Sequence, residues 1–260
     1  MDATELLTRY DQQQRIDIEY PGTRKEILPE GVVRFVRPAP GMNFVHYSRL
    51  DPAVVDSVIQ AQIDYFSPLG QPFSWHVLGH DAPPDLPRRL AAHGFQPDPP
   101  GALMVLDLDT ASAALFEPLM TDVRAIKSRA ELEAVIAVEA EVWSANSDWM
   151  RHRLGDHLQI PDYLDIYVAY ADGRPACAGW VYFSRGSQFG SLFGGSTMPA
   201  YRGRGLYTAV LAARARAARR RGYRFLCVDA NPMSQPIVAR HGFRQLTHTY
   251  DYVWTGQRPN

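Results

Sequence analysis

The segment Ser191–Leu211, SLFGGSTMPAYRGRGLYTAVL, constrains the fold of this 260-residue chain more than any other. An apolar run leads through a short loop with Gly203 and Gly205 into a segment of strong helix formers. Glycine lets backbone N–H groups approach a ligand closely, and the first N–H groups of a helix have no partner within it. Arg202 and Arg204 add positive charge. We therefore predict a strand, a phosphate-binding loop and a helix, although an ordinary tight turn with solvated arginines fits the same letters.

Two other nucleotide-binding loops compare less well with this segment. A Walker loop requires a Gly-Lys-Ser/Thr ending, which this segment lacks. A dinucleotide-binding fold is the better rival, because Gly203-x-Gly205 is followed by a helix and a strand that ends in Asp229. Thr208 stands where the third glycine belongs, and Pro199–Arg202 separate the strand from the glycines. Dinucleotide binding is therefore the second alternative.

Hydrophobic periodicity in the rest of the chain predicts helices mixed with short strands. Apolar residues recur at helical spacing in the segments 52–66, 86–93, 132–142, 206–221 and 237–241. Strand-like runs cover residues 73–79, 102–108, 123–126, 165–171, 176–183, 191–195, 223–230 and 246–254. Hairpin-like turns such as ADGRP favour antiparallel pairing. We expect an α/β (α+β) fold with a mixed, mostly antiparallel sheet flanked by helices.

The two halves of the chain share a short sequence signal. RRLAAHGF in the first half and IVARHGF in the second each end a short helix with His-Gly-Phe before a strand. A duplication explains the signal, and so does the common glycine C-cap. Few structural signals occur between residues 109 and 121, apart from Pro118. We therefore predict two domains, residues 1–115 and 119–260.

Two motifs in the second half resemble those of one known family. YRGRGLYTAVL is similar to the R/Q-x-x-G-x-G/A acyl-CoA signature of the GNAT superfamily, and ANPMSQPIVARHGF resembles that superfamily's segment ending in Leu-Gly-Phe. The resemblance covers about residues 123–254 and implies a twisted sheet in which two neighbouring strands splay apart around the cofactor. Gly194 and Gly195 suit a bulge in such a strand. The first half has no such loop, so the resemblance implies a degenerate GNAT-like copy there and one active site.

This resemblance implies acetyl-CoA as the co-substrate, without a metal. Residues 195–197 would face the pantetheine arm, and residues 203–208 would bind the pyrophosphate. The implied cofactor-binding residues are Gly195, Ser196, Thr197, Arg202, Gly203, Arg204, Gly205, Leu206, Tyr207, Thr208 and Asn231. Tyr207 departs from the signature, which has Gly or Ala there, so its side chain is expected to crowd the site. Asn231 lies near a position where many members contact CoA, and Pro232 shifts the register by up to one residue.

Attack of an amine on a thioester needs a base, because an amine with a pKa of about 10 is protonated at neutral pH. The positions where many family members have a Tyr acid and a Glu base hold Val238 and Ser191. We predict Asp229 as the base, with a carboxylate that only caps a turn as the alternative. Tyr250 is the predicted acid. It shares one face of the last strand with His248, Tyr252 and Trp254, and core packing is the favoured explanation for most of that face.

Other charged residues allow a functional and a structural interpretation. Glu139, Glu141, Trp143 and Trp149 lie where the resemblance places acceptor recognition, although a solvated helix face explains the glutamates as well. The arginines at 214, 216, 219, 220, 221 and 224 are interpreted as a solvated helix end. His76 and His80 have the spacing of metal ligands, but no adjoining carboxylate or cysteine cluster supports a metal.

Composition describes an ordinary globular protein, with a formal charge of -1 and 46% hydrophobic residues. This composition names no partner; the resemblance implies a small-molecule or peptide amine, and we predict no nucleic acid, no membrane, and a monomer or homodimer. No run approaches the roughly 20 apolar residues of a membrane span, and the first residues lack a signal peptide, so a cytoplasmic location is expected. The predicted function is an N-acetyltransferase, with a non-catalytic acyl-CoA sensor as the alternative. Cys177 and Cys227 are expected to be buried thiols.

Overall fold

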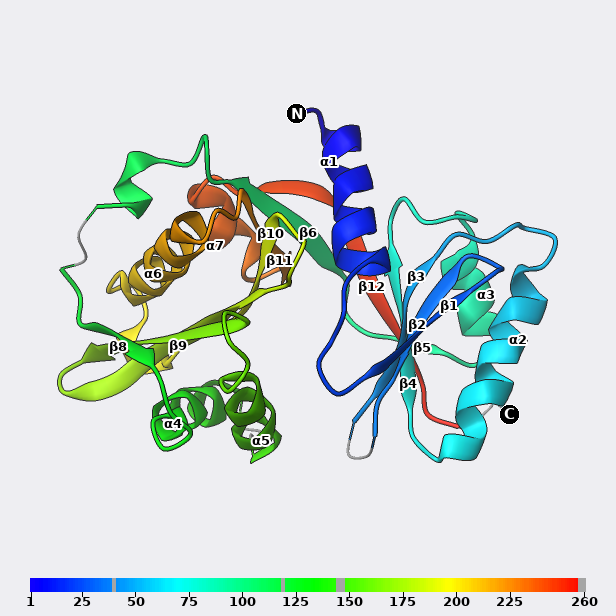
Figure 1. Ribbon diagram of the computed structural model, residues 1–260, viewed down its shortest axis with the longest axis horizontal. Helices are drawn as coiled ribbons and strands as arrows, with labels where there is room; N and C mark the ends of the chain where they lie inside the picture. Colours follow the sequence, from blue (N-terminus) through cyan, green and yellow to red (C-terminus); the bar gives the residue numbers. More distant parts are fainter. Residues whose placement is uncertain (39–40, 118–119, 144–147, 257–260) are drawn as a thin grey trace. The chain divides into compact units, whose positions relative to one another are not determined.

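The computed structural model describes residues 1–38, 41–117, 120–143 and 148–256 (Figure 1). The chain divides into two compact units, which are called unit 1 and unit 2 below. Unit 1 contains Met1–Met104, Asp229–Arg240 and Arg244–Asn260, and unit 2 contains Val105–Val228 and His241–Phe243. The predicted domains, residues 1–115 and 119–260, stay a prediction about folding units, and residues 118 and 119 at their boundary lie outside the described residues.

Unit 1 is a mixed sheet with helices on both faces. Its strands lie in the order β1-β2-β3-β4-β12, and β5 pairs with β12; β3 and β4 are parallel, and the other described pairs are antiparallel. The strands are β1 (Arg24–Leu28), β2 (Val32–Val36), β3 (Asn43–Ser48), β4 (Phe73–Leu78), β5 (Gln96–Pro97) and β12 (Arg244–Trp254). The helices are α1 (Ala3–Tyr10), the π-helix η1 (Asp11–Ile16), α2 (Val55–Phe66), the 3-10 helix η2 (Ser67–Leu69), α3 (Leu86–Ala92) and α7 (Gln235–Arg240).

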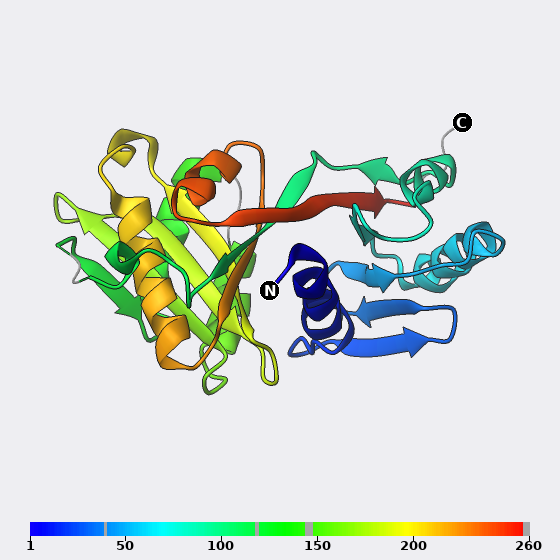
Figure 2. The same ribbon diagram turned by 90° about the horizontal axis from the view of Figure 1, so that it is seen from above.

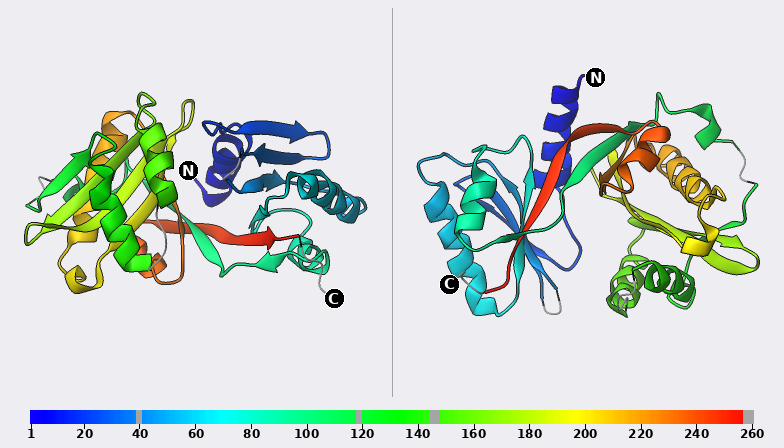
Figure 3. Two further views of the ribbon diagram at one scale, coloured as in Figure 1. Left: turned by 90° about the horizontal axis from the view of Figure 1, so that it is seen from below. Right: turned by 180° about the vertical axis from the view of Figure 1, so that it is seen from behind.

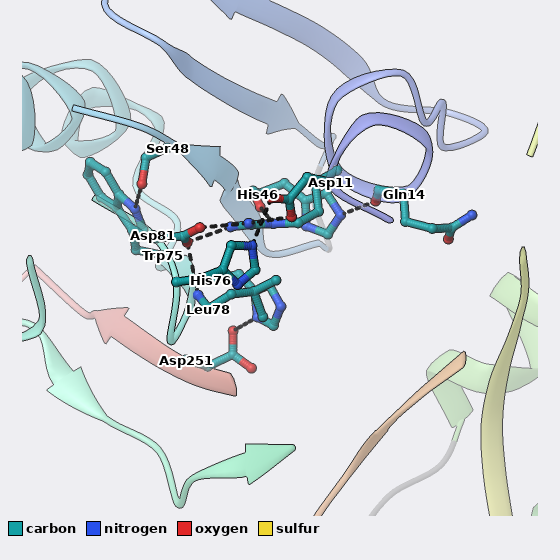
Figure 4. A network of polar contacts seen from close by, with 11 residues as sticks. Asp11, Gln14, His46, Ser48, Trp75, His76, Leu78, Asp81 and Asp251 are labelled. Carbon is teal, nitrogen blue, oxygen red and sulfur yellow. Dashed lines mark hydrogen bonds and ion pairs between the residues drawn. The ribbon is translucent and has the colours of Figure 1, made fainter. Parts of the chain in front are cut away.

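The hydrophobic core of unit 1 lies between α2, α3 and one face of this sheet. Trp75 is fully buried in it, and its indole N–H donates to the Ser48 hydroxyl at 3.0 Å (Figure 4). The bond satisfies the polar atom of a residue that otherwise supplies apolar area. Burying an aromatic side chain of this size contributes about 1.5–3 kcal/mol.

A buried ion network fixes the π-helix η1 to the end of β4. The Arg15 guanidinium is fully buried and donates to both carboxylate oxygens of Asp81, at 2.7 and 2.6 Å, and to Asp11 at 2.9 Å. Figure 4 shows the two aspartates on either side of this contact. Two carboxylates offset the cost of burying the guanidinium, so loss of either one should destabilise unit 1 strongly.

Unit 2 is a five-strand layer in the order β7-β8-β9-β10-β11. The pair β10–β11 is parallel, and the other pairs are antiparallel. The strands are β7 (Val123–Ile126), β8 (Leu164–Ala171), β9 (Arg174–Phe183), β10 (Phe189–Thr197) and β11 (Phe225–Ala230). Strand β11 belongs to unit 2 up to Val228 and to unit 1 after it, and β6 (Gly101–Asp107) belongs to unit 1 up to Met104 and to unit 2 after it. The helices are η3 (Ala113–Leu115), α4 (Leu132–Trp143), α5 (Asp148–His157), the 3-10 turn η4 (Pro199–Tyr201) and α6 (Leu206–Arg220).

Helices cover both faces of this layer. Figure 2 shows α6 across one face, where Leu206 and Val210 pack on Ala169 and Cys177. Figure 3 shows α4 and α5 on the opposite face, over a cluster that includes Trp180. The predicted fold class, a mixed and mostly antiparallel sheet flanked by helices, is confirmed.

Some elements were not predicted from the sequence. The sequence patterns predicted no element in the first fifty residues, but these contain α1, η1 and the strands β1 to β3. Helix α5 was also missed. Within the described ranges, no helix has both the length and the apolar character needed to span a bilayer.

Candidate functional site

The candidate site in unit 2 begins at a bulge in β10. Gly194 pairs with Gly179 and Ser196 pairs with Ala178, so Gly195 is an extra residue in the strand. Gly194 and Gly195 have φ angles of 69° and 86°, a region that glycine adopts without steric cost. A Cβ at Gly194 would lie 2.5 Å from the Trp180 ring. The bulge predicted from the two glycines is confirmed.

Strands β10 and β11 separate before the bulge. Their parallel pairing joins Phe189 to Phe225 and ends where Ser191 meets Cys227. In the described part of the chain, the register between these two strands goes no further, although β10 continues to Thr197. The backbone of β10 beyond Ser191 is therefore open on that side. Such an edge can hydrogen-bond an extended ligand as a further strand would.

A glycine-rich loop follows β10 and ends at the N-terminus of α6. Gly203 and Gly205 have φ angles of 74° and 77°, and Gly205 is the N-cap of the helix without a side-chain hydrogen bond. The Ala209 N–H donates to the Gly205 carbonyl at 3.0 Å, so the N–H groups of residues 206–208 lie ahead of the helical ladder. A Cβ at either loop glycine would meet nothing within 4 Å. The loop is open and suits an anion.

The two arginines of the loop have different contacts. The Arg202 side chain donates to the Thr197 carbonyl at 3.2 Å and holds the loop against the end of β10. Arg204 forms an ion pair with Asp172 at 2.9 Å, and its guanidinium lies 5.3 Å from the centre of the Tyr201 ring. Both arginines are exposed. Their charges therefore stand at the open loop, with that of Arg204 offset by Asp172.

Tyr207 points away from the loop and toward the bulge. A Cβ at Gly195 would lie 2.8 Å from Cε2 of this ring, so the ring packs on the Gly195 backbone. Burial raises the pKa of the Tyr207 hydroxyl. The expected crowding therefore falls at the bulge, whereas the glycine loop stays clear.

Arg214 is buried rather than solvated, which corrects the interpretation of the α6 arginines. Its side chain is 1% exposed, Nη1 donates to the Phe193 carbonyl at 3.3 Å, and Nη2 has no hydrogen-bond partner among the described residues. Burial lowers the pKa of this guanidinium. Gly179 makes room for it, because a Cβ there would lie 3.1 Å from the guanidinium carbon. A contact of this kind depends on the tertiary structure and leaves no pattern in the sequence.

Glu139 is the second buried charge beside the bulge. It lies on α4, is 3% exposed, and has the Ser196 and Trp143 side chains beside its carboxyl. The Trp143 indole N–H also donates to the Ser196 hydroxyl at 3.0 Å. Burial raises the pKa of the Glu139 carboxyl. The solvated-face interpretation is therefore wrong for Glu139, while Glu141 on the same helix is exposed.

Thr208 and Leu206 occupy opposite sides of the first turn of α6. The Thr208 hydroxyl is exposed and lies 3.2 Å from Nε2 of His241, whose pKa is lowered by burial. Leu206 is buried in the cluster beneath the helix, so its contribution at the loop is limited to its backbone.

Asp229 and Tyr250, the predicted base and acid, both lie in unit 1. The Asp229 carboxylate accepts a hydrogen bond from the Thr249 hydroxyl at 2.5 Å, and burial raises its pKa. Neighbouring residues of a strand point to opposite faces, so Tyr250 faces away from Thr249 and packs on the hydrophobic core of unit 1. Asp229 of β11 therefore contacts one face of β12, whereas the Tyr250 side chain lies on the other face.

Asp229 also belongs to a set of possible metal ligands. Ligand atoms of His76, Asp229 and Asp251 lie within 4.8 Å of one another, and Figure 4 shows His76 facing Asp251. His80, considered with His76 from the sequence, instead contacts Asp11 at 2.8 Å. Asn231 caps the turn before α7, where its side-chain oxygen accepts from the Ser234 N–H at 2.9 Å.

Comparison with known proteins gives the class of this protein. Residues 132–243 match the model of the Acetyltransferase (GNAT) family. The chain is similar to a GCN5-related N-acetyltransferase from Kribbella flavida, with 15% identity, a TM-score of 0.69 and coverage of 98% of this chain and 95% of that chain. It is similar to a functionally unknown conserved protein from Staphylococcus epidermidis ATCC 12228, with 14% identity, a TM-score of 0.68 and coverage of 90% and 94%. A tandem GNAT protein from the clavulanic acid biosynthesis pathway matches with 15% identity, a TM-score of 0.61 and coverage of 94% and 86%. No curated protein matches the chain.

The structure is a GNAT fold of the kind found in tandem GNAT proteins. Residues 132–243 therefore form a GNAT acetyltransferase domain, and the family-level activity of such domains is acyl-CoA-dependent N-acetyl transfer. The resemblance stated from the two motifs is confirmed. Strands β8, β9 and β10 are antiparallel, so unit 2 lacks the parallel sheet of the dinucleotide-binding fold.

Proposed function

We propose that this protein transfers the acetyl group of acetyl-CoA to a primary amine by direct attack of the amine on the thioester. One observation carries the proposal: the open edge of β10 leads through the bulge into the open loop at the N-terminus of α6. Backbone N–H groups are thus available along a path that an extended ligand with an anionic group can follow. This combination suits a pantetheine arm and its pyrophosphate.

The chain's own residues fit the parts of acetyl-CoA. Residues 195–197 would hold the pantetheine arm, and the N–H groups of residues 203–208 would hold the pyrophosphate, with Arg202 and Arg204 adding charge. Neither loop glycine has a neighbour that would obstruct a phosphate. Tyr207 supports this assignment, because its ring packs on the bulge and leaves its own amide free for the ligand. Contact of Asn231 with CoA stays a prediction.

The reaction forms an N–C bond to the acetyl carbonyl and breaks the C–S bond of the thioester. The ammonium group of the acceptor must first lose one proton, and the departing thiolate takes the second proton from the attacking nitrogen. N–H groups of the opened β10 backbone are suited to stabilise the oxyanion. The assignments of Asp229 as base and Tyr250 as acid, the amine partner, the cytoplasmic location and the monomeric or homodimeric state all stay predictions.

A second candidate function is an acyl-CoA sensor without turnover. It is favoured by Val238 and Ser191, which stand where the resemblance expects a Tyr acid and a Glu base. In the structure Val238 is buried, and the Ser191 hydroxyl lies 3.5 Å from the Cys227 sulfur. Neither residue can transfer a proton as those groups do.

Two measurements test the proposed function. Calorimetric titration should show binding of acetyl-CoA and none of NAD, and binding of NAD alone would refute the cofactor assignment. A panel of primary amines with acetyl-CoA should then yield acetylated product and free CoA by mass spectrometry. Binding of acetyl-CoA with no product from any amine would refute the transferase and support the sensor.

A further inference from the structure

Glu139 combines two features that rarely occur together. Its side chain is 3% exposed, and Oε1 has no hydrogen-bond partner in the part of the chain that the structure describes. Burying a carboxylate oxygen without a partner costs free energy that an apolar side chain at the same position would not require. A buried carboxylate that lowers stability in this way is a candidate for a functional role.

The position of Glu139 connects it to the bulge. Ser196 follows the extra residue Gly195, and its hydroxyl accepts a hydrogen bond from Trp143 at 3.0 Å. The Glu139 carboxyl lies beside the same Ser196 side chain. The carboxylate is therefore one side chain away from the backbone that the proposed function assigns to the thioester end of the cofactor.

The surroundings of Glu139 supply no fixed positive charge among the described residues. Strand β10 has no titratable side chain. On β9, the titratable group on the face toward α4 and α5 is Tyr182, whose hydroxyl lies 2.9 Å from Nδ1 of His157, while Cys177 packs under α6 on the other face. Four titratable side chains of α5 contact residues other than Glu139: Arg151 contacts Glu133, Arg153 contacts Trp149, Asp156 contacts Arg129, and His157 contacts Tyr182.

We propose that Glu139 accepts the proton of the acceptor ammonium in the acetyl transfer. This rests on the proposed function, and it assigns the step to a residue that neither family motif contains. The N–H bond of the ammonium breaks as its proton moves to Oε1, and the neutral nitrogen attacks the thioester carbon. The C–S bond breaks, the thiolate takes the second nitrogen proton, and Glu139 returns its proton to solvent. The acceptor class is a primary amine that arrives protonated, because a buried anion without a cation attracts one.

The test compares Glu139→Gln with Glu133→Gln, an exposed glutamate on the same helix, from about pH 6 to about pH 9. Without the carboxylate, the reaction depends on amine that is already neutral, and this fraction rises about tenfold per pH unit below an amine pKa of about 10. Loss of kcat/KM in Glu139→Gln should therefore be about 100-fold or more near pH 7 and shrink toward pH 9. Glu133→Gln should follow the wild type, and Glu139→Asp should keep the wild-type pH profile at a lower rate.

Calorimetry with acetyl-CoA separates the two proposals. The Glu139→Gln variant should bind acetyl-CoA as the wild type does, since it keeps a hydrogen-bonding side chain of the same size. A loss of activity that is equal at every pH, or no loss, overturns the role of Glu139. The role is also overturned if Asp229→Asn shows the pH-dependent loss instead. A wild type that neither binds acetyl-CoA nor makes product refutes the proposed function itself.

Discussion

An aspartate at Gly205 should weaken acetyl-CoA binding about 30-fold. Gly205 has a φ angle of 77° and open space where a Cβ would lie, so Asp or Asn can be placed there with the least strain of any residue that has a side chain. The added charge would stand beside two phosphate charges at the start of α6. Two unit charges about 4 Å apart in water repel by about 1 kcal/mol. Two such pairs give about 2 kcal/mol, or about 30-fold in Kd.

The assay is calorimetric titration of acetyl-CoA into Gly205→Asp and Gly205→Asn, which differ in charge and hardly in shape. Gly186→Asp is the control for a remote charge, because Gly186 has a φ angle of 80° and open space as well. The Asn variant and the control should bind within a few-fold of the wild type. The Asp-to-Asn ratio should shrink at high salt, where the screening length falls to about 3 Å at 1 M. Equal Kd values for Asp and Asn would refute a phosphate at this loop.

Further expectations concern stability and thiol reactivity. Asp81→Asn should lower the free energy of unfolding by about 3–5 kcal/mol in urea titrations, because Arg15 is fully buried, and an unchanged midpoint would contradict the network. Gly194→Ala should destabilise by at least about 1–2 kcal/mol, since a Cβ there meets Trp180 at a positive φ angle; a melting temperature equal to that of the wild type would be inconsistent with the bulge. Burial raises the pKa of Cys227 from 9.0 to about 12. The stability that comes from keeping this thiol neutral is therefore complete below about pH 9 and is lost between about pH 9 and about pH 12. Native protein at pH 8 should not react with a thiol reagent, whereas urea should expose both cysteines, and fast native labelling would argue against burial.

The glycine loop before α6 could be predicted from local signals in the sequence. Helix α6 was predicted over residues 206–221 and spans Leu206–Arg220. The glycines at 203 and 205 have positive φ angles, which few other residues adopt, and helix formers follow at once. Each of these preferences acts within a few residues. The sequence of one chain is sufficient to show them.

Features that depend on contacts between residues far apart in the sequence could not be predicted. Strands β1 and β2 contain charged residues such as Arg34, which is 7% exposed and pairs with Glu26 across the hairpin. Glu139 and Arg214 look like solvated helix residues until the sheet is in place. Alternation on β12 correctly grouped Tyr250 with Trp254, but only the structure shows that this face packs on the core of unit 1. Burial of a charge is a property of the folded chain rather than of its neighbours in sequence.

The last strand of the chain has a consequence for synthesis. Strand β12 pairs along β4, from Thr249 with Leu78 to Trp254 with Phe73. The first hundred residues therefore leave the ribosome with one edge of their sheet unpaired, and the missing strand is made only after most of unit 2. An exposed edge of this kind is prone to pair with another chain. Unit 1 should thus mature only after β12 has been synthesised, and a fragment that stops near residue 115 should aggregate when expressed alone.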